Sequence, residues 1–276
     1  LALIQPTNSS QIMNLVDIGA NLSHESFSDD LDIVVTAAQA AGVSHIIITG
    51  TDQKSNEAGL NLSQARPEIF SFTAGFHPHV AESLDENALL SVRALASEDK
   101  CVAVGETGLD FNRNLSDPET QLKVFEEHLK LAAELGKPLF LHQRDAHPEF
   151  IDLLRRYRDQ IVGGVVHCFT DNQQALEDYL ALGMYIGITG WVCDERRGTN
   201  LQSLVGLIPS DRLLIETDSP YLLPRTIRPK PKTRRNEPKH LIEVLYTLSR
   251  CCGRPAEQLS LQTSENAKRL FGVGPD

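Results

Sequence analysis

The sequence predicts an α/β fold in which parallel strands alternate with helices to form a TIM-type (β/α)8 barrel. The chain of 276 residues is close to the roughly 250 residues that this barrel usually needs. Short runs rich in Val, Ile and Leu alternate with amphipathic stretches of helical periodicity. Because eight such units follow one another without a Pro-, Gly- or Ser-rich linker, we expect a closed barrel that forms one domain over residues 13–276.

The expected strands are short apolar runs whose centres lie roughly 20 to 35 residues apart, which suits a strand followed by a helix. They are Leu15–Ile18, His45–Thr49, Phe72–Gly75, Val102–Gly105, Leu139–Leu141, Gly164–Val166, Tyr185–Ile188 and Leu213–Ile215. Helices are expected at residues 30–41, 119–135 and 172–182, and a glycine, the usual C-terminal cap, follows each of them. A final pair of helices is expected at about residues 238–252 and at 255–271.

The composition is that of a globular protein that works away from membranes. The sequence has no apolar run of the roughly 18 residues that a membrane-spanning helix needs, and its start lacks the features of a signal peptide. Since Met13 is the first candidate start, we interpret residues 1–12 as a cloning remnant or a disordered N-terminal extension. The five cysteines are odd in number and irregularly spaced, which argues against a disulfide framework and favours the cytoplasm. We also expect a monomer.

Polar side chains follow five of the expected strands at the point where each strand ends. Because the catalytic face of a barrel is formed by the C-terminal ends of its strands, we expect these side chains to meet there. One such residue alone is more often a structural hydrogen-bonding group or a helix cap than a ligand. Several charged groups at the mouth of an apolar barrel, however, need a cation or another partner to offset their desolvation. The residues are His77, His79, Glu106, His142, His167 and Asp218.

Nitrogen and oxygen donors of this kind are the ligands that divalent metals use in proteins. We therefore predict a metal site built from Glu106, His142, His167 and Asp218. Imidazoles with a carboxylate suit zinc or manganese by ligand type, whereas magnesium prefers oxygen donors. The donor types alone leave the choice of metal open.

The segments that hold these residues resemble the signature motifs of the TatD family of metal-dependent deoxyribonucleases. The matching segments follow the family's order from about Leu15 to Phe271, and several are long, so the signal is specific. They are Gly75–His79, Gly105–Asp110, His142–Ala146, His167–Phe169, Glu216–Leu222 and Arg235–Pro238. The resemblance implies a TIM-barrel hydrolase of the metal-dependent type that cuts DNA. It also implies that Glu106, His142 and His167 bind metal, and that Asp218 contacts the metal or the attacking water.

Residues 187–198 resemble one bacterial branch of this family more closely. That resemblance implies a nuclease that removes nucleotides from the 3′ end of single-stranded DNA or RNA. It further implies the use of magnesium and a part in DNA repair in the cytoplasm. We therefore rank Mg²⁺ first as the cofactor, with Mn²⁺ and Zn²⁺ as the alternatives.

The sequence departs from the family pattern after the first strand. Most members carry His-x-His there, whereas Gly19 and Asn21 stand at the two histidine positions in this chain. Glycine offers no side chain, and asparagine offers only a neutral amide oxygen as a ligand. The metal position that the two histidines would build is therefore weak, differently made or absent.

These residues suggest how a phosphodiester bond would be hydrolysed. A divalent ion polarises water and neutralises phosphate oxygens, and we expect Glu106, His142 and His167 to hold it. We expect Asp218 to orient or deprotonate the attacking water. We expect His77 to contact the scissile phosphate or the leaving group.

A basic run, residues 225–235, points to the substrate. It contains six Arg or Lys residues and no acid, and its prolines predict an extended loop at the barrel mouth. The run is either a solvated loop without a partner or a rail for a phosphate backbone, which would give salt-dependent binding. We favour the rail and expect substrate contacts from His77, His79, Arg144, Arg196, Arg197, Arg225, Arg234, Arg235 and Phe169.

The remaining charge and the aromatic residues refine this expectation. The net charge of −11 would repel long duplex DNA, so a single-strand end that enters a basic mouth is the better fit. Aromatic residues beside the motifs either stack on bases or pack the top of the barrel. They are Phe76, Phe111, Phe169, Trp191 and Tyr221.

Two other functions fit parts of this pattern. The first is a metal-dependent amidohydrolase or deacylase that acts on a small or aminoacyl substrate, although such a substrate has no need of a basic rim. The second is a non-catalytic nucleic-acid-binding or quality-control protein that lost activity together with His-x-His. Cleavage assays on oligonucleotides and on amide or ester substrates separate these alternatives.

Overall fold

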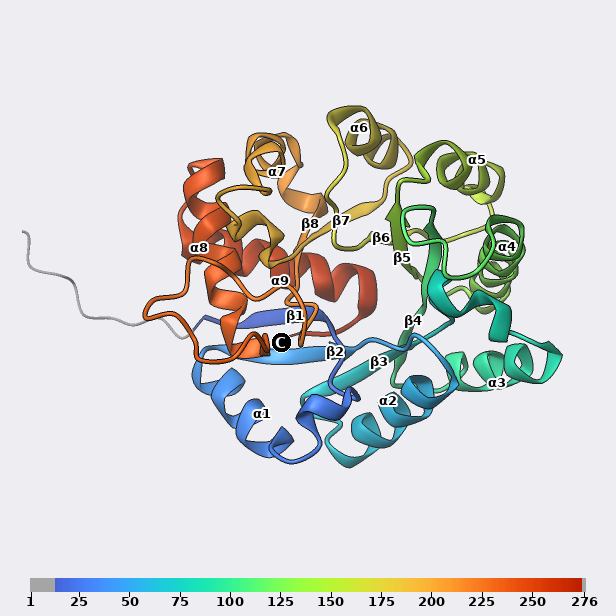
Figure 1. Ribbon diagram of the computed structural model, residues 1–276, viewed down its shortest axis with the longest axis horizontal. Coiled ribbons are helices and arrows are strands. Elements are labelled where there is room, and N and C mark those ends of the chain that lie inside the picture. Colours follow the sequence, from blue (N-terminus) through green and yellow to red (C-terminus); the bar gives the residue numbers. More distant parts are fainter. Residues whose placement is uncertain (1–12, 275–276) are drawn as a thin grey trace, which may run out of the picture.

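The computed structural model describes residues 13–274, so the interpretation of residues 1–12 lies outside the described part. Its eight parallel strands follow one another in chain order and curve into a nearly closed barrel (Figure 1), as the sequence predicts. The strands are β1 (Leu15–Ala20), β2 (Val43–Ile48), β3 (Phe70–Ala74), β4 (Cys101–Asp110), β5 (Leu139–Arg144), β6 (Gly164–Val166), β7 (Tyr185–Ile188) and β8 (Leu213–Ile215).

The α-helices surround the strands (Figure 1). They are α1 (Leu31–Ala40), α2 (Gln53–Ala65), α3 (Glu86–Ala96), α4 (Pro118–Leu135), α5 (His147–Tyr157), α6 (Gln173–Ala181), α7 (Thr199–Leu204), α8 (Leu241–Cys252) and α9 (Ala256–Phe271). Their ends follow local chemistry: Asp117 accepts a hydrogen bond from the N–H of Thr120 at the start of α4, and Gly136 ends that helix with a φ of 62°. Within residues 13–274, no helix is both long and apolar enough to cross a membrane.

Strand β4 is longer than the sequence predicts. The expected strand stops at Gly105, whereas β4 continues through Glu106 to Asp110 and stays paired with β5. The pairing places Gly108 beside His142 and Asp110 beside Arg144. Strand β4 therefore carries polar side chains well into the mouth of the barrel.

An apolar cluster lies inside the barrel below these polar groups. It includes Ile18, Ile47, Phe140 and Leu214, all of them fully buried, and Phe271 of α9 packs into it. The Phe140 ring lies 4.6 Å from the His167 ring, centroid to centroid, so the apolar cluster directly supports the polar site. Water is thereby kept to one side of the polar groups.

The seam between β1 and β8 is held by hydrogen bonds that involve one buried side chain. The Asp17 carboxylate accepts from the backbone N–H of Thr217 at 2.9 Å and from its hydroxyl at 2.6 Å. Backbone bonds from Asp218 N–H to the Gly19 carbonyl and from Asn21 N–H to the Ser219 carbonyl continue the seam. The seam thus fixes the chain directly after β8, where the last polar motif lies.

Candidate metal centre

One carboxylate oxygen at the mouth of the barrel contacts three histidines. Oε1 of Glu106 lies 2.8 Å from Nε2 of His167, 3.0 Å from Nδ1 of His142 and 3.2 Å from Nε2 of His77. These side chains come from the end of β6, from β5 and from the segment after β3, as expected for residues at strand ends. Glu106 is only 4% exposed, so its charge depends on these neighbours.

A metal ion could be held by part of this cluster. His77, Glu106 and His142 each offer one ligand atom, and these atoms lie within 4.8 Å of one another. The sequence analysis assigned His77 to the substrate, whereas the structure places it among the candidate ligands. His167, an expected ligand, contacts Glu106 as well. The donor set of imidazole nitrogens and one carboxylate fits a divalent cation.

The electrostatics of the cluster also fit a cation. Burial lowers the pKa of His77 to about 4, so this imidazole is neutral near pH 7, the form that binds metal. Burial opposes charge on Glu106 too, yet His167 and His77 hold the pKa of its carboxyl well below the usual value. In turn, Glu106 and Glu216 outweigh burial and raise the pKa of His167 well above its usual value. A bound cation would take over the charge that a proton on His167 supplies.

Asp218 lies at the edge of the cluster, directly after β8. Its Oδ1 accepts a hydrogen bond from the amide of Asn21 at 3.0 Å, and its backbone has a φ of 55°. Burial, together with the charges of Glu106 and Glu216, raises the pKa of Asp218 to about 7. Asn21 therefore orients the acidic residue, which gives a structural role to one of the two positions that depart from His-x-His.

The other position, Gly19, lies against a buried carboxylate that the sequence analysis overlooked. Glu216 is fully buried, and its Oε1 accepts from the Cys168 N–H at 2.6 Å while its Oε2 lies 3.3 Å from Nδ1 of His167. A Cβ at Gly19 would lie 2.6 Å from Oε2, and one at Gly187 would lie 2.8 Å from Oε1. A histidine at position 19 therefore has no room here.

Asp110 is a second residue that the sequence analysis overlooked. Its Oδ2 lies 2.7 Å from Nε2 of His79 and 3.2 Å from Nε2 of His142. Burial disfavours its charge, but hydrogen bonds from His142 and His79 keep the pKa of Asp110 far below its usual value. The His142 ring is thus held between Asp110 and Glu106, and His79 is oriented by Asp110. The only sequence signal was its place at the end of the Gly105–Asp110 motif.

The basic rim is more neutralised than the sequence suggests. Arg225 forms a two-point ion pair with Glu195, and Arg197 pairs with Asp194 through Nε at 2.9 Å. Arg196 lies 3.8 Å from Glu195. Within residues 13–274, the exposed side chains of Arg144 and Arg234 make no hydrogen bond or ion pair. These two are the rim arginines that remain available to a phosphate.

Two of the expected substrate contacts do not fit the structure. Arg235 forms hydrogen bonds to Asp30 and Glu237 and packs over the Phe27 ring, so its charge is used within the protein. Phe169 is 3% exposed and meets Tyr179 edge to face, so it has no open face for a base. Both corrections arise because the partners come from segments distant in the sequence.

An eight-stranded parallel barrel with a carboxylate and histidines at its mouth defines a class, the metal-dependent barrel hydrolases. Comparison with known families then narrows the class. The family model described as TatD related DNase matches residues 16–272. The chain belongs to this family, and it is a nuclease, a hydrolase that acts on nucleic acid.

Individual relatives agree with this family. The chain is 50% identical over 257 residues to the 3′-5′ ssDNA/RNA exonuclease TatD of Pectobacterium parmentieri (strain WPP163), covering 93% of this chain and 99% of that one. A crystal structure of a hydrolase TatD family protein from Entamoeba histolytica has a TM-score of 0.86 at 28% identity, covering 95% and 99% of the two chains. A TatD homolog from Escherichia coli K12 has the same TM-score, identity and coverage.

Proposed function

We propose that this nuclease is a metal-dependent exonuclease that removes nucleotides from the 3′ end of single-stranded DNA and RNA. The observation that carries this proposal is the contact of Glu106 Oε1 with the nitrogens of His77, His142 and His167 at the barrel mouth. The relative from Pectobacterium parmentieri, 50% identical along almost its whole length, carries this activity in its name. The direction of cleavage and the preference for single strands are carried over from that relative.

The side chains divide the chemical work. We assign His77, Glu106, His142 and His167 to the binding of a divalent cation. When bound, this cation polarises the water and the phosphate oxygens of the scissile bond. Asp218, whose raised pKa of about 7 suits proton transfer near neutral pH, accepts the proton of the attacking water while Asn21 fixes its other oxygen. His79, held by Asp110, faces the same mouth and is available to the substrate.

We propose Mg²⁺ as the working metal, with Mn²⁺ second and Zn²⁺ third. The protein donors are mostly nitrogen, so magnesium requires oxygen ligands from water and from the substrate phosphate. Manganese accepts nitrogen and oxygen donors alike. We further propose that the protein acts as a monomer, in DNA repair in the cytoplasm; its five cysteines are all free, which suits a reducing compartment.

End-labelled oligonucleotides test the proposed function directly. A 5′-labelled single strand incubated with Mg²⁺ should give a ladder of products that shorten from the 3′ end, and chelator should abolish it. Glu106→Gln should remove this activity while the circular dichroism spectrum and melting temperature stay close to wild type. Cuts inside duplexes at the rate of free ends, or hydrolysis of amide or ester substrates instead, would refute the proposal. Binding without cleavage in any divalent metal would favour a non-catalytic protein.

A further inference from the structure

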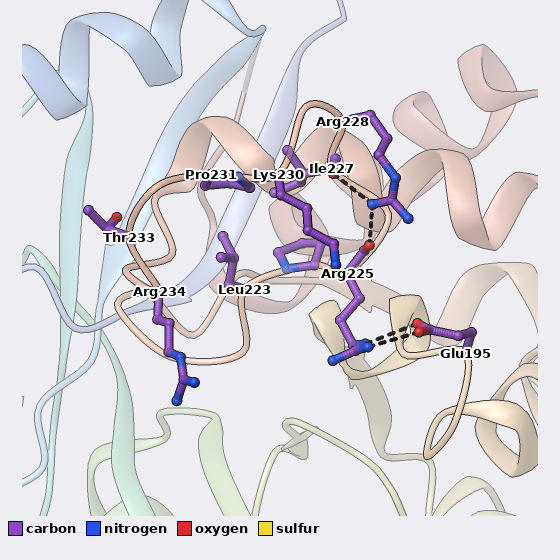
Figure 2. Close-up of a pocket in the computed structure, with 10 residues that line it drawn as sticks. Glu195, Leu223, Arg225, Ile227, Arg228, Lys230, Pro231, Thr233 and Arg234 are labelled. Atoms are coloured by element: carbon purple, nitrogen blue, oxygen red, sulfur yellow. Dashed lines mark hydrogen bonds and ion pairs between the residues drawn. The ribbon is translucent and has the colours of Figure 1, made fainter.

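A cavity separate from the candidate metal centre opens between the segments that follow β7 and β8. Its volume is about 490 Å³, within the roughly 300–1,000 Å³ of pockets that hold small ligands. Its lining includes the apolar surfaces of Trp191, Leu222 and Leu223 and the guanidinium groups of Arg197, Arg225 and Arg234. An adjoining cavity of about 260 Å³ shares Leu223, Arg225 and Arg234, and Figure 2 shows the latter two on either side of Leu223.

The three arginines differ in how firmly they are held. The Arg197 guanidinium lies 4.5 Å from the Trp191 ring centroid, and its Nε pairs with Asp194, so its position is fixed. Arg225 extends toward Glu195 and pairs with it through two nitrogens (Figure 2). Arg234 makes no hydrogen bond or ion pair within residues 13–274. Two acids therefore face three arginines, and the positive charge left over resides on Arg234.

An apolar, partly aromatic floor beside an uncompensated guanidinium matches the two parts of a nucleotide. A base is flat and packs on aromatic and aliphatic surfaces, and a phosphate binds the planar fork of an arginine. The cavity also lies along the route of a strand, since Leu222 follows Asp218 by only four residues in the chain. Its lining includes none of the candidate metal ligands, so an occupant would be remote from the scissile bond.

We propose that this cavity is a subsite for one nucleotide of the single-stranded substrate, away from the bond that is cut. The base packs against Trp191 and the leucines, and the phosphate binds Arg234. Glu195 limits this affinity because it occupies the Arg225 fork that a phosphate would otherwise use. The proposal rests on the proposed function, since it takes a single strand to be the ligand.

The composition of the chain makes the subsite easy to observe. Trp191 is the single tryptophan in the sequence, so tryptophan fluorescence reports on this cavity alone. The probe is a strand of about eight thymidines, added in chelator to prevent cleavage. In wild type the fluorescence should be quenched to saturation, with a Kd that rises with salt. Thymidine without phosphate should quench weakly in comparison with thymidine monophosphate.

Matched variants of the two loops decide the matter. Arg234→Ala should raise the Kd about five- to tenfold and reduce the salt dependence by about one ion. Lys232→Ala is the control, because it removes the same charge from the same exposed loop but lines neither cavity. Its Kd should stay within about twofold of wild type, consistent with a merely nearby charge. Glu195→Gln, which frees Arg225, should lower the Kd.

The outcomes of this experiment and of the cleavage assay are separable. Equal effects of Arg234→Ala and Lys232→Ala, or unchanged fluorescence at saturating strand, would overturn the subsite. If wild type shortens labelled strands but its fluorescence does not respond, the subsite fails and the exonuclease stands. If the quench is saturable and depends on Arg234 but no metal supports cleavage, the exonuclease fails and the subsite stands.

Discussion

Glu216 lies directly behind His167, with its Oε2 at 3.3 Å from Nδ1, while Nε2 on the other side of the same ring faces Glu106 at 2.8 Å. The ring is therefore held between two buried carboxylates. Such an outer carboxylate fixes the orientation of a histidine and makes its outer nitrogen a better ligand. Glu216 is thus a positioning residue for the candidate metal centre.

Replacing this carboxylate should weaken the centre without breaking the fold. We expect Glu216→Gln to lower the affinity for Mn²⁺ by about 10- to 100-fold, since the amide cannot supply the charge that orients His167. Calorimetric titration of the cation measures this change without reliance on turnover. Unchanged affinity in a variant that melts like wild type would show that Glu216 has only a structural part.

The space at Gly19 should be intolerant of any side chain. A Cβ there would lie 2.6 Å from Glu216 Oε2 and 2.8 Å from the Phe140 ring, so Gly19→Ala should reduce the free energy of unfolding by about 1–3 kcal/mol. Gly206→Ala is the matched control, because a Cβ at Gly206 meets nothing within 4 Å. Urea denaturation compares the two, and equal stabilities would contradict the crowding at Gly19.

Stability should fall in acid partly through His128. This fully buried ring accepts the N–H of Phe76 at Nε2 and contacts the Val124 carbonyl through Nδ1, and burial lowers its pKa to about 4. The unfolded histidine titrates near its ordinary pKa of about 6.5, so between these values the unfolded chain binds the proton and the folded chain does not. Stability is therefore retained above about pH 6.5 and lost as the pH falls toward 4.

The magnitude follows from the shift. Between pH 7 and pH 4.5, His128 should cost wild type about 2 kcal/mol, and His128→Gln should lose that much less over the same interval. Urea denaturation at the two pH values measures the difference, in which any cost of the substitution at pH 7 cancels. Parallel losses in the two proteins would mean that His128 does not control the acid response.

Arg235 should matter for the fold rather than for the substrate. Its bonds to Asp30 and Glu237 are charge-assisted, so Arg235→Ala should destabilise the protein by about 1–3 kcal/mol and leave the Kd for single strands nearly unchanged. Arg144→Ala, at an exposed side chain with no partner in residues 13–274, should do the opposite. A large loss of strand affinity in Arg235→Ala would restore it as a substrate contact.

The fold could be predicted from sequence because the strands of a parallel barrel are buried on both faces and appear as apolar runs. All eight of the predicted strands exist in the predicted order. Strand β4 was placed too short because Gly105 and Glu106 end its apolar run, whereas its pairing with β5 continues to Asp110. Local composition does not record a ladder that is maintained by the neighbouring strand.

The convergence of Glu106, His142 and His167 was predictable because barrel topology brings strand ends together. Their roles as ligands remain a prediction. The contribution of His77 to the same cluster, and the positions of Asp110 and Glu216 behind the histidines, depend on side-chain geometry that topology does not fix. The neutralisation of the rim was missed for a related reason, since Asp30 and Glu195 belong to other loops and only the folded chain brings them to the arginines.

The seam between the first and last strands has a consequence for how activity appears during synthesis. The backbone of Asp218 is tied to Gly19, and Asp17 is tied to Thr217, 200 residues further along the chain. A nascent chain that still lacks β8 has neither the acid nor the partner that closes the barrel. The polypeptide therefore cannot attack RNA near its own ribosome until translation has almost finished.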